Sequence, residues 1–388
     1  MRLDASDVEV CVADEPAPAA AGPQPMATPI VQTSLFAFPT FEALLDGLGG
    51  EYRETVYTRG RNPTVMALER KLAALERGES CSCFGSGMAG VSAVMLGLLE
   101  AGQRVLFVNQ VYGPTLQLAR HLRRFGIEHD VLLDLDPEAV RAALRPNTRL
   151  VWLESPGTML FRVMDVAAVA GVAREHGVLT CLDNSWATPL LQKPIELGVD
   201  VVVHSATKYI GGHSDVVAGA VVSTEARMEQ IFFRAYLLNG GILGPFDAWL
   251  LLRGLRTLPA RLRQHEEDAL ALASFLRGHP AVRRVHHPAF DDPGLVHRQL
   301  RGYSGLFSFE LANDDFDTVS AVVDRLRRFR IGVSWGGVES LVISPDRRSR
   351  AARLEALGIP RGLVRLSVGL EGAELLVRDL ERALEAAS

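Results

Sequence analysis

The sequence predicts an α/β protein with a large, mostly parallel sheet flanked by helices and a smaller C-terminal α/β domain. Three observations predict this class. From about residue 60, short apolar runs alternate with amphipathic segments, a Leu- and Arg-rich stretch at 246–276 then interrupts the alternation, and a second, shorter series of elements follows it. Strands that are joined by single helices pair in parallel, with helices covering both faces of the sheet.

The elements of the first domain follow from apolar periodicity and turn residues. Residues 80–84 end in Gly-Ser-Gly, and the apolar residues after this turn recur at helical spacing, which indicates a strand, a tight turn and a buried helix. The further helices are predicted at 64–77, 88–99, 115–125, 137–144 and 166–176. The further strands are predicted at 104–108, 128–133, 150–154, 179–183 and 199–204, with a last apolar run at 216–222.

The stretch at 246–276 predicts one long helix or a kinked pair around Pro259. Beyond it, apolar runs lie at 282–285, 306–311, 331–334, 341–344 and 364–368, with helices near 318–329 and at 373–387. We therefore place a domain boundary near residue 256, between a first domain at 61–256 and a C-terminal domain at 257–388.

Composition limits the function classes. The chain has 388 residues, of which 48% are hydrophobic and 22% charged, and its formal net charge is -5, so no global positive field attracts nucleic acid or an anionic membrane. The four cysteines lack a CxxC pair and a nearby His at ligand spacing, which predicts neither a metal site nor a disulfide framework. Residues 1–27 mix acidic residues with an Ala/Pro run and lack the order of a signal peptide. We expect a disordered extension there and a cytoplasmic protein.

Three local features lie at predicted carboxyl ends of strands, where ligands bind in open parallel sheets. The first is Gly85-Ser86-Gly87-Met88, whose backbone can approach a phosphate at a helix N-terminus, although plain turn chemistry is an equal explanation. The second is Asp183, which ends an apolar strand and needs a cation if it is buried, or else caps the next turn.

The third feature is Lys208, just beyond the apolar strand that ends at His204. A low dielectric there lowers the pKa of the amine toward the range in which it is a nucleophile. The chain has only two other lysines, and we expect both Lys71 and Lys193 to be solvated surface residues. A phosphate site, an anion for a ring nitrogen and a nucleophilic lysine together predict pyridoxal 5'-phosphate as the cofactor.

The sequence resembles the cystathionine/methionine-metabolism family of fold-type I pyridoxal-phosphate enzymes over nearly everything after residue 27. Within the family it is most similar to the bacterial cystathionine β-lyases. The matching segments include Tyr57-Thr58-Arg59-Gly60, Gly85-Ser86-Gly87-Met88, Asp183-Asn184-Ser185, Ser205-Ala206-Thr207-Lys208-Tyr209, Ser334-Trp335-Gly336-Gly337 and Arg365-Leu366. The resemblance implies the fold-type I transferase-like architecture and an arm at 28–60 that contacts a neighbouring subunit.

The resemblance also implies a role for each matching residue. Lys208 would bind the cofactor covalently and then remove the substrate Cα proton, and Asp183 would pair with the ring nitrogen. The phosphate would be held by Gly87, Met88, Ser205 and Thr207, and by Tyr57 and Arg59 of the neighbouring subunit. Tyr112 would stack on the ring, and Arg365, with Ser334, would bind the substrate carboxylate, with Trp335 and Val333 beside it. From the residues alone, a salt-bridge partner is the favoured interpretation of Arg365 and a turn residue that of Tyr112, and the resemblance reverses this preference.

Two departures bear on the reaction. Family members that act at the γ-carbon of cystathionine tend to carry Glu before the residue matching Ser334, and bacterial β-lyases carry Tyr, where this chain has Val333. Many members carry Asn where Thr158 stands. The loss of a carboxylate argues against γ-chemistry on cystathionine.

The expected function is therefore α,β-elimination of L-cystathionine or a related L-cysteine S-conjugate to a thiol such as homocysteine, pyruvate and ammonia. Lys208, Tyr57 or Tyr112 would protonate the leaving sulfur. The alternatives are γ-elimination or γ-replacement on methionine or an O-acyl homoserine, and, in another class, a scaffold that binds the cofactor without turnover. The family also implies a homotetramer of two active dimers.

Overall fold

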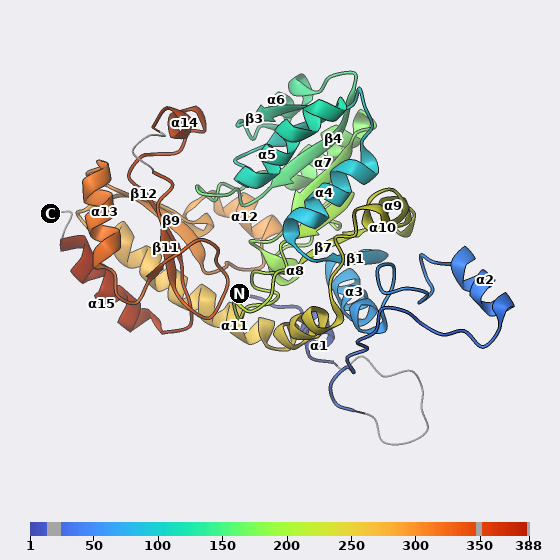
Figure 1. Cartoon of the computed structure of the whole chain (residues 1–388). Helices are drawn as coiled ribbons and strands as arrows, with labels where there is room; N and C mark the ends of the chain where they lie inside the picture. The colour runs from blue at the N-terminus through green and yellow to red at the C-terminus, as the bar shows by residue number, and fades with distance from the viewer. Residues whose placement is uncertain (14–24, 347–350, 386–388) are drawn as a thin grey trace.

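The computed structural model of the chain describes residues 1–13, 25–346 and 351–385 (Figure 1). Its larger sheet has the strand order β1-β7-β6-β5-β4-β2-β3. The four pairs from β6 to β3 are parallel, whereas β7 runs antiparallel to both β1 and β6. The strands are β1 Ser80–Phe84, β2 Arg104–Val108, β3 Glu128–Leu132, β4 Thr148–Glu154, β5 Leu179–Asp183, β6 Val201–His204 and β7 Gly219–Ser223.

Helices cover both faces of this sheet, as the alternation predicts. On one face of the sheet, an apolar cluster joins α4 and α5 to side chains of β2 and β4. On the opposite face, a second cluster joins α6 and α7 to the alternate side chains of the same two strands. The helical segments of this part are α3 Pro63–Glu76, α4 Gly87–Leu98, α5 Gly113–Leu122, η1 Arg123–Phe125, α6 Pro137–Ala143, α7 Val166–Glu175, α8 Thr188–Leu191, α9 Glu225–Ile231, the π-helix η2 Phe232–Tyr236 and α10 Leu237–Asn239.

The smaller sheet has the order β10-β11-β12-β9-β8 and is antiparallel except for the β10–β11 pair. Its strands are β8 Val282–His286, β9 Leu306–Leu311, β10 Arg330–Ile331, β11 Leu341–Ile343 and β12 Leu363–Ser367. The accompanying segments are η3 Pro288–Phe290, α12 Pro293–Gln299, α13 Phe316–Arg325, α14 Ala351–Ala356 and α15 Ala373–Leu384. The fold class predicted from the sequence is thus confirmed.

One long helix, α11 Pro245–Arg277, runs from the larger sheet to the smaller one (Figure 1). It continues through Pro259, so it is the single helix of the two predicted alternatives. Proline removes one intrahelical donor. Nearby in the same helix, the carbonyl of Gly254 accepts from two side chains, Arg261 Nη2 at 2.8 Å and Thr257 Oγ1 at 3.2 Å.

Residues 1–13 are folded, so the expectation of a disordered extension is wrong for them. Helix α1 Ala5–Val12 is capped by the side chain of Asp4, and both Asp7 and Cys11 are fully buried. Of the rest of the expected extension, 14–24 lie outside the described residues, and 25–27 form neither helix nor strand. Composition indicated disorder because it counts the acidic residues without the basic groups that they meet in the fold.

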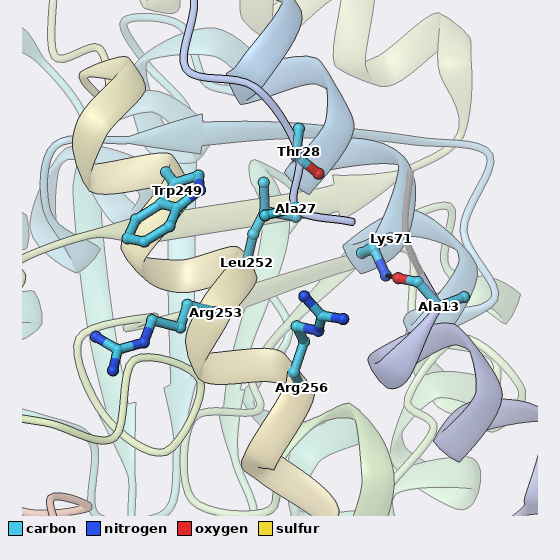
Figure 2. A pocket seen from close by; sticks show the side chains of 8 residues that line it. All are labelled: Ala13, Ala27, Thr28, Lys71, Trp249, Leu252, Arg253 and Arg256. Atoms are coloured by element: carbon cyan, nitrogen blue, oxygen red, sulfur yellow. Dashed lines mark hydrogen bonds between the residues drawn. The ribbon is translucent and has the colours of Figure 1, made fainter. Parts of the chain in front are cut away.

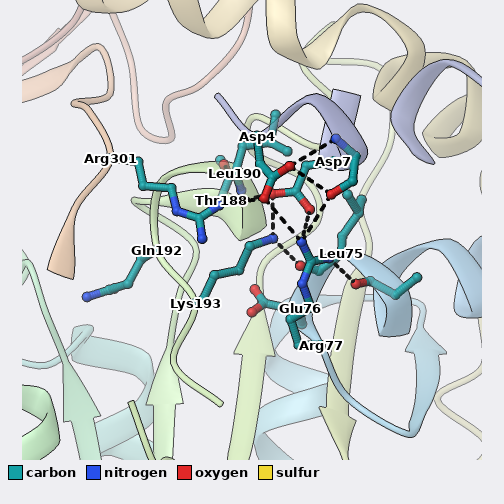
Figure 3. A network of polar contacts seen from close by, with 12 residues as sticks. Asp4, Asp7, Leu75, Glu76, Arg77, Thr188, Leu190, Gln192, Lys193 and Arg301 are labelled. Atoms are coloured by element: carbon teal, nitrogen blue, oxygen red, sulfur yellow. Dashed lines mark hydrogen bonds and ion pairs between the residues drawn. The ribbon is translucent and has the colours of Figure 1, made fainter. Parts of the chain in front are cut away.

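The expectation that Lys71 and Lys193 are solvated is also wrong. Lys71 is 5% exposed and its amine donates to Val10 O at 2.7 Å, and Lys193 is 3% exposed and pairs with Asp7 at 2.8 Å. Figure 3 shows Lys193 and Arg77 converging on the carboxylates of α1. Both lysines therefore help to hold the N-terminal helix against α3.

Residues 28–62 form an arm that projects from the body of the protein and carries helix α2 Phe41–Gly49 at its outer end (Figure 1). Large apolar side chains on it are open to solvent, including Leu35, Phe41, Leu45 and Leu48, each at least half exposed. Among the described residues, no helix is both long enough and apolar enough to cross a bilayer.

Candidate active site

Two neighbouring strand ends place Asp183 and Lys208 at one edge of the larger sheet. Asp183 is the last residue of β5 and lies beside Val203 in the parallel register with β6. Lys208 follows four residues after β6 ends at His204. Because both strands run in the same direction, their carboxyl ends bring the carboxylate and the lysine loop together, as the sequence predicts.

Ser185 connects these two segments, and sequence reasoning did not single it out. Its hydroxyl donates to Asp183 Oδ1 at 2.6 Å and accepts the N–H of Ser205 at 2.6 Å, while its own N–H also reaches Asp183 Oδ1 at 3.1 Å. One carboxylate oxygen is thereby occupied. Among the described residues no hydrogen bond reaches Asp183 Oδ2, so this oxygen is available to a ligand.

Burial raises the pKa of Asp183, while the hydrogen bonds from Ser185 and the charges of His204 and Lys208 act in the opposite direction. A partly buried carboxylate of this kind is stabilised by a cation. The protonated ring nitrogen of pyridoxal phosphate is such a cation, so Asp183 fits the cofactor.

The surroundings of the Lys208 amine favour its neutral form. Its pKa is lowered to about 8, chiefly by burial and then by the positive charge of Arg365, while Asp183 opposes the shift. Its Nζ lies 2.5 Å from the hydroxyl of Ser334 and 5.4 Å from the centre of the Trp335 ring. Lys208, Ser334 and Trp335, which the sequence predicted as site residues, are therefore brought together.

Close backbone packing fixes the position of the lysine loop. At Gly336, which has a φ of +84°, a Cβ would lie 2.9 Å from Tyr209 N. At Gly254 of α11, a Cβ would lie 2.6 Å from Gly211 O. Since neither approach leaves room for a side chain, the loop is clamped between α11 and the segment that follows β10.

The phosphate-binding prediction coincides with the start of α4. Ser86 caps this helix by accepting the N–H of Ala89 at 3.0 Å, and the first N–H groups, those of Gly87 and Met88, have no acceptor within the helix. A Cβ on Gly87 would lie 3.0 Å from the hydroxyl oxygen of Ser205. The cradle between α4 and the lysine loop thus suits an anion and excludes a larger residue at 87.

Thr207 is held by the backbone next to β7. Its hydroxyl donates to Ala218 O at 3.1 Å and accepts the N–H of Ala218 at 2.9 Å. The single hydroxyl proton of Thr207 can be donated to only one acceptor at a time. To donate to a bound phosphate, Thr207 would therefore give up its hydrogen bond to Ala218 O.

Arg365 and Tyr112 interact electrostatically with each other at the site. Arg365 is in β12, where burial lowers its pKa to about 10 and the nearby Tyr112 and Glu154 oppose the shift. Its Nη2 lies 3.5 Å from Ser334 O. Tyr112 is 49% exposed at the start of α5, so its ring is accessible.

Glu154 is a second acidic group that sequence reasoning missed as a site residue. It ends β4 just as Asp183 ends β5, and it accepts the N–H of Tyr112 at 2.8 Å. Burial and the neighbouring Asp183 raise the pKa of Glu154 well above its ordinary value. Its place at a strand end was a signal that could have identified it.

The remaining predicted residues lie further out. The contacts of Tyr57 and Arg59 are within the arm, where the Arg59 guanidinium lies 5.5 Å from the Tyr57 ring and Tyr57 bridges Leu35. Val333 is 74% exposed on the segment that leads into Ser334. The predicted strand 331–334 is wrong beyond its first residue, because β10 ends at Ile331 and Ser334 adopts a left-handed φ of +83°.

A separate small pocket of about 60 Å³ lies beside α11 (Figure 2). Its lining combines Trp249 and Leu252 with Lys71, Arg253 and Arg256. None of the residues predicted for the active site lines it.

The fold, the lysine loop and the anion cradle define a pyridoxal-phosphate-dependent enzyme of the α/β type. A family profile described as Cys/Met metabolism PLP-dependent enzyme matches residues 14–385. The chain belongs to this family, and the family resemblance predicted from the sequence is confirmed.

Similar proteins carry different activities. The chain is 40% identical to the cystathionine γ-lyase of Bacillus subtilis over 369 residues, which cover 93% of this chain and 94% of the relative. It is also 40% identical to the cystathionine β-lyase of Lactococcus lactis subsp. cremoris over 370 residues, with 93% and 94% covered. The crystal structure of cystathionine γ-synthase from Xanthomonas oryzae pv. oryzae superposes with a TM-score of 0.90 at 38% identity, covering 98% of each chain. The family is therefore shared, but similarity alone does not select one reaction.

Proposed function

We propose that the protein is a carbon–sulfur lyase that carries out α,β-elimination on an L-cysteine S-conjugate, with L-cystathionine as the default substrate. One water is consumed, the Cβ–S bond breaks, and the products are a thiol such as homocysteine, pyruvate and ammonia. The observation that carries the proposal is the position of the Lys208 amine, 2.5 Å from Ser334 and with the positive charge of Arg365 nearby.

Bound pyridoxal phosphate would withdraw electrons from the substrate Cα, and the chain would supply the groups that hold and move protons. With a pKa of about 8, Lys208 is partly neutral near neutral pH and can accept the Cα proton. Arg365 would bind the substrate carboxylate through its guanidinium. Asp183 would hold the proton on the ring nitrogen, and Gly87, Met88, Ser205 and Thr207 would hold the phosphate.

The leaving sulfur also needs a proton. Lys208 can donate the proton that it has accepted from Cα. Tyr112 is the second candidate donor, because within one chain it interacts electrostatically with Arg365 and Asp183. Burial raises the pKa of Tyr112, so its phenol stays protonated and able to donate at neutral pH. Tyr57 of the neighbouring subunit would approach the same site.

The β-regiochemistry rests on Val333. Its apolar side chain is exposed next to Ser334, at the position where family members that act at the γ-carbon of cystathionine tend to carry a carboxylate. A valine cannot accept a proton or bind an amine there. Val333 with Trp335 and Ser334 would instead border the distal part of the substrate.

The test is to incubate the purified enzyme with L-cystathionine and identify the keto acid. Pyruvate is expected, and 2-oxobutyrate would establish γ-elimination, the reaction named for the Bacillus subtilis relative. Methionine and an O-acyl homoserine are assayed in parallel. Lys208→Ala is the control: it should lose turnover, whereas a scaffold function without turnover would survive the substitution.

Borohydride reduction tests the lysine assignment independently. It should fix the cofactor to the peptide that contains Lys208. Because the chain has only three lysines, attachment at Lys71 or Lys193 would be unambiguous and would overturn the site.

The exposed apolar side chains of the arm support a shared site. Phe41 is 74% exposed on a helix that projects from the body, which suits an arm that packs on a second copy of the chain. We propose a homotetramer of two active dimers in which the arm at 28–60 delivers Tyr57 and Arg59 to the phosphate of the neighbouring subunit.

A further inference from the structure

The arm returns to the body of the protein through Arg61, a buried charged residue. Its side chain is 6% exposed, and α3 begins two residues later at Pro63. The guanidinium carbon lies 4.6 Å from the centre of the Tyr52 ring and 4.9 Å from that of the Phe232 ring. Nε donates to Tyr52 O at 2.5 Å, and Nη1 donates to Glu69 Oε2 at 2.9 Å. Two aromatic rings and two acceptors therefore fix the orientation of this group.

The groups that hold the guanidinium are themselves fixed to the body of the protein. Glu69 lies on α3, and its other carboxylate oxygen, Oε1, accepts the N–H of Cys83 at 2.8 Å. Cys83 belongs to β1, the edge strand of the larger sheet. The hydroxyl of Tyr52 lies 2.8 Å from that of Ser80 at the start of the same strand. Phe232 is fully buried in the π-helix η2. The base of the arm is thus bonded to the edge of the sheet.

The backbone of Arg61 closes the turn that contains the two arm residues expected to reach a neighbouring cofactor. Its N–H donates to Tyr57 O at 3.1 Å, and the N–H of Gly60 donates to the same oxygen at 2.8 Å. Arg59 lies inside this turn, with its guanidinium 5.5 Å from the Tyr57 ring. Tyr57 and Arg59 are exposed, whereas Gly60 and Arg61 are buried. One residue therefore anchors its side chain in the body and holds the exposed turn by its N–H.

A buried guanidinium gives direction to this anchor. Burying the charge costs free energy, and an apolar residue could fill the same space at a lower cost. The planar fork of arginine, however, binds acceptors in one fixed geometry and stacks between rings. The contacts of Arg61 thus specify where the turn points.

We propose that Arg61 is a positioning residue that fixes the turn at Tyr57–Gly60, so that Tyr57 and Arg59 are already in place for the cofactor phosphate of the neighbouring subunit. Arg61 itself touches neither substrate nor cofactor in this assignment. The inference rests on the proposed role of the arm. If the turn were free to move, its binding-competent conformation would be populated part of the time, and the apparent affinity for the cofactor would fall by that fraction.

The test places Arg61→Met on one chain or the other of a hybrid dimer, isolated through different affinity tags on the two chains. The first chain carries Arg59→Ala and keeps Lys208, and the second carries Lys208→Ala and keeps Arg59. The complete site of the hybrid then lies on the first chain and uses the arm of the second. Its occupancy is read without turnover, as the amount of pyridoxal phosphate that borohydride fixes to the Lys208 peptide.

Arg61→Met on the second chain should raise the concentration of pyridoxal phosphate that half-fills the complete site by about tenfold and lower turnover at limiting cofactor. On the first chain, the same substitution alters an arm that serves no complete site, so both quantities should stay unchanged. Arg61→Lys keeps a charge beside Glu69 but loses the planar group between the rings. On the second chain it should therefore cause a smaller loss than Arg61→Met.

Arg53→Met is the matched control, because Arg53 lies on the same arm and also pairs with a residue of the body. It lies 2.6 Å from Glu225, but the two side chains are 71% and 45% exposed. Exposed pairs contribute little, so Arg53→Met should leave occupancy and turnover unchanged on either chain.

Three results separate the inference from the proposal on which it rests. Equal losses from the two placements of Arg61→Met would show that Arg61 supports its own chain in general, and this would overturn the inference. An undiminished affinity with Arg61→Met on the second chain would overturn it as well. If the shared site itself is wrong, the hybrid with Arg61 intact in both chains recovers no turnover and binds the cofactor no better than the Arg59→Ala parent.

Hydrogen exchange of the wild-type protein provides a test without mutation, which decides the case in which the variants do not fold. The amides of Gly60 and Arg61 should be protected in the cofactor-free dimer, because the turn is fixed before the cofactor binds. Amides that became protected only when pyridoxal phosphate was added would show that the cofactor orders the turn, and Arg61 would then have no positioning role.

Discussion

The amine of Lys208 and the hydroxyl of Ser334 lie 2.5 Å apart, so the reactive group of the larger domain is oriented by a residue of the smaller one. In making this contact Ser334 has a φ of +83°, which a non-glycine residue rarely adopts. Such a conformation costs on the order of 1 kcal/mol and is kept where the surroundings fix it. Here Gly336, packed against the backbone of Lys208 and Tyr209, fixes it.

Ser334→Ala should lower kcat by about fivefold to tenfold and change KM less, because it removes one hydrogen bond worth about 1 kcal/mol from the amine that moves the proton. Steady-state kinetics with cystathionine measures both constants. Ser223→Ala is the control, since Ser223 in β7 is buried and its hydroxyl donates to Asp200 O. Equal kcat values for the two variants would contradict a role for Ser334.

Lys208→Met should stabilise the cofactor-free protein near neutral pH. In the folded chain the pKa of Lys208 is lowered to about 8, whereas in the unfolded chain it is about 10.4. Between these values the unfolded state binds more protons, so the stability of the wild type rises with pH over this window. The advantage of the variant is therefore largest below about pH 8 and shrinks toward pH 10.

Urea denaturation of the cofactor-free proteins at several pH values measures this difference. Lys193→Met is the matched control, because burial also lowers the pKa of Lys193 but its ammonium is paired with Asp7. That variant should be less stable than the wild type across the range. A Lys208→Met advantage that did not change between pH 7 and pH 10 would show that the pKa of the Lys208 amine is the same in the folded and the unfolded apoprotein.

Mixing two inactive variants tests the shared site. In a hybrid of Arg59→Ala and Lys208→Ala subunits, one site combines the intact Lys208 of the first chain with the intact Arg59 of the second. Random exchange makes half of the dimers hybrid, and half of their sites are complete, so about a quarter of wild-type activity should return. Mixing Lys208→Ala with Asp183→Ala should restore nothing, because both residues serve the site of their own chain. No recovery in the first mixture would place Arg59 outside the neighbouring site.

Local patterns predicted those parts of the fold that depend on local physics. Strands 104–108, 179–183 and 306–311 agree residue for residue with β2, β5 and β9, because each is an apolar run bounded by turn residues. The antiparallel placement of β7 between β1 and β6 could not be predicted this way, since strand order is decided by packing between distant segments.

The site shows the same division. Asp183 stands out in the sequence because it ends an apolar strand, and Lys208 because it closely follows one. Glu154 ends a strand as Asp183 does and was overlooked. The burial of Lys71 and Lys193 has no local signal in the sequence. The carbonyl that accepts from Lys71 and the carboxylate that pairs with Lys193 both belong to the N-terminal helix, far away in the chain. Charge and composition alone assign such residues to solvent.

Asp7→Asn tests whether that distant pairing holds α1 in place. Asp7 is fully buried and its carboxylate faces Lys193 at 2.8 Å, Arg77 at 2.9 Å and Arg301 at 3.4 Å (Figure 3). The amide would leave buried positive charge without a counter-ion, and breaking a buried pair from one side costs about 3–5 kcal/mol. The free energy of unfolding in urea should fall by that order, and protection of the α1 amides from hydrogen exchange should fall with it.

A control variant and a double variant test whether unpaired buried charge causes the loss of stability in Asp7→Asn. Glu138→Gln removes one partner of a surface pair with Arg141 and should change stability little. Asp7→Asn combined with Lys193→Met removes both buried charges, so it should recover part of what Asp7→Asn loses, since less unpaired positive charge then remains beside α1. If Asp7→Asn cost no more than Glu138→Gln, apolar packing around Cys11, and not the ion pairs, would be what anchors the N-terminal helix.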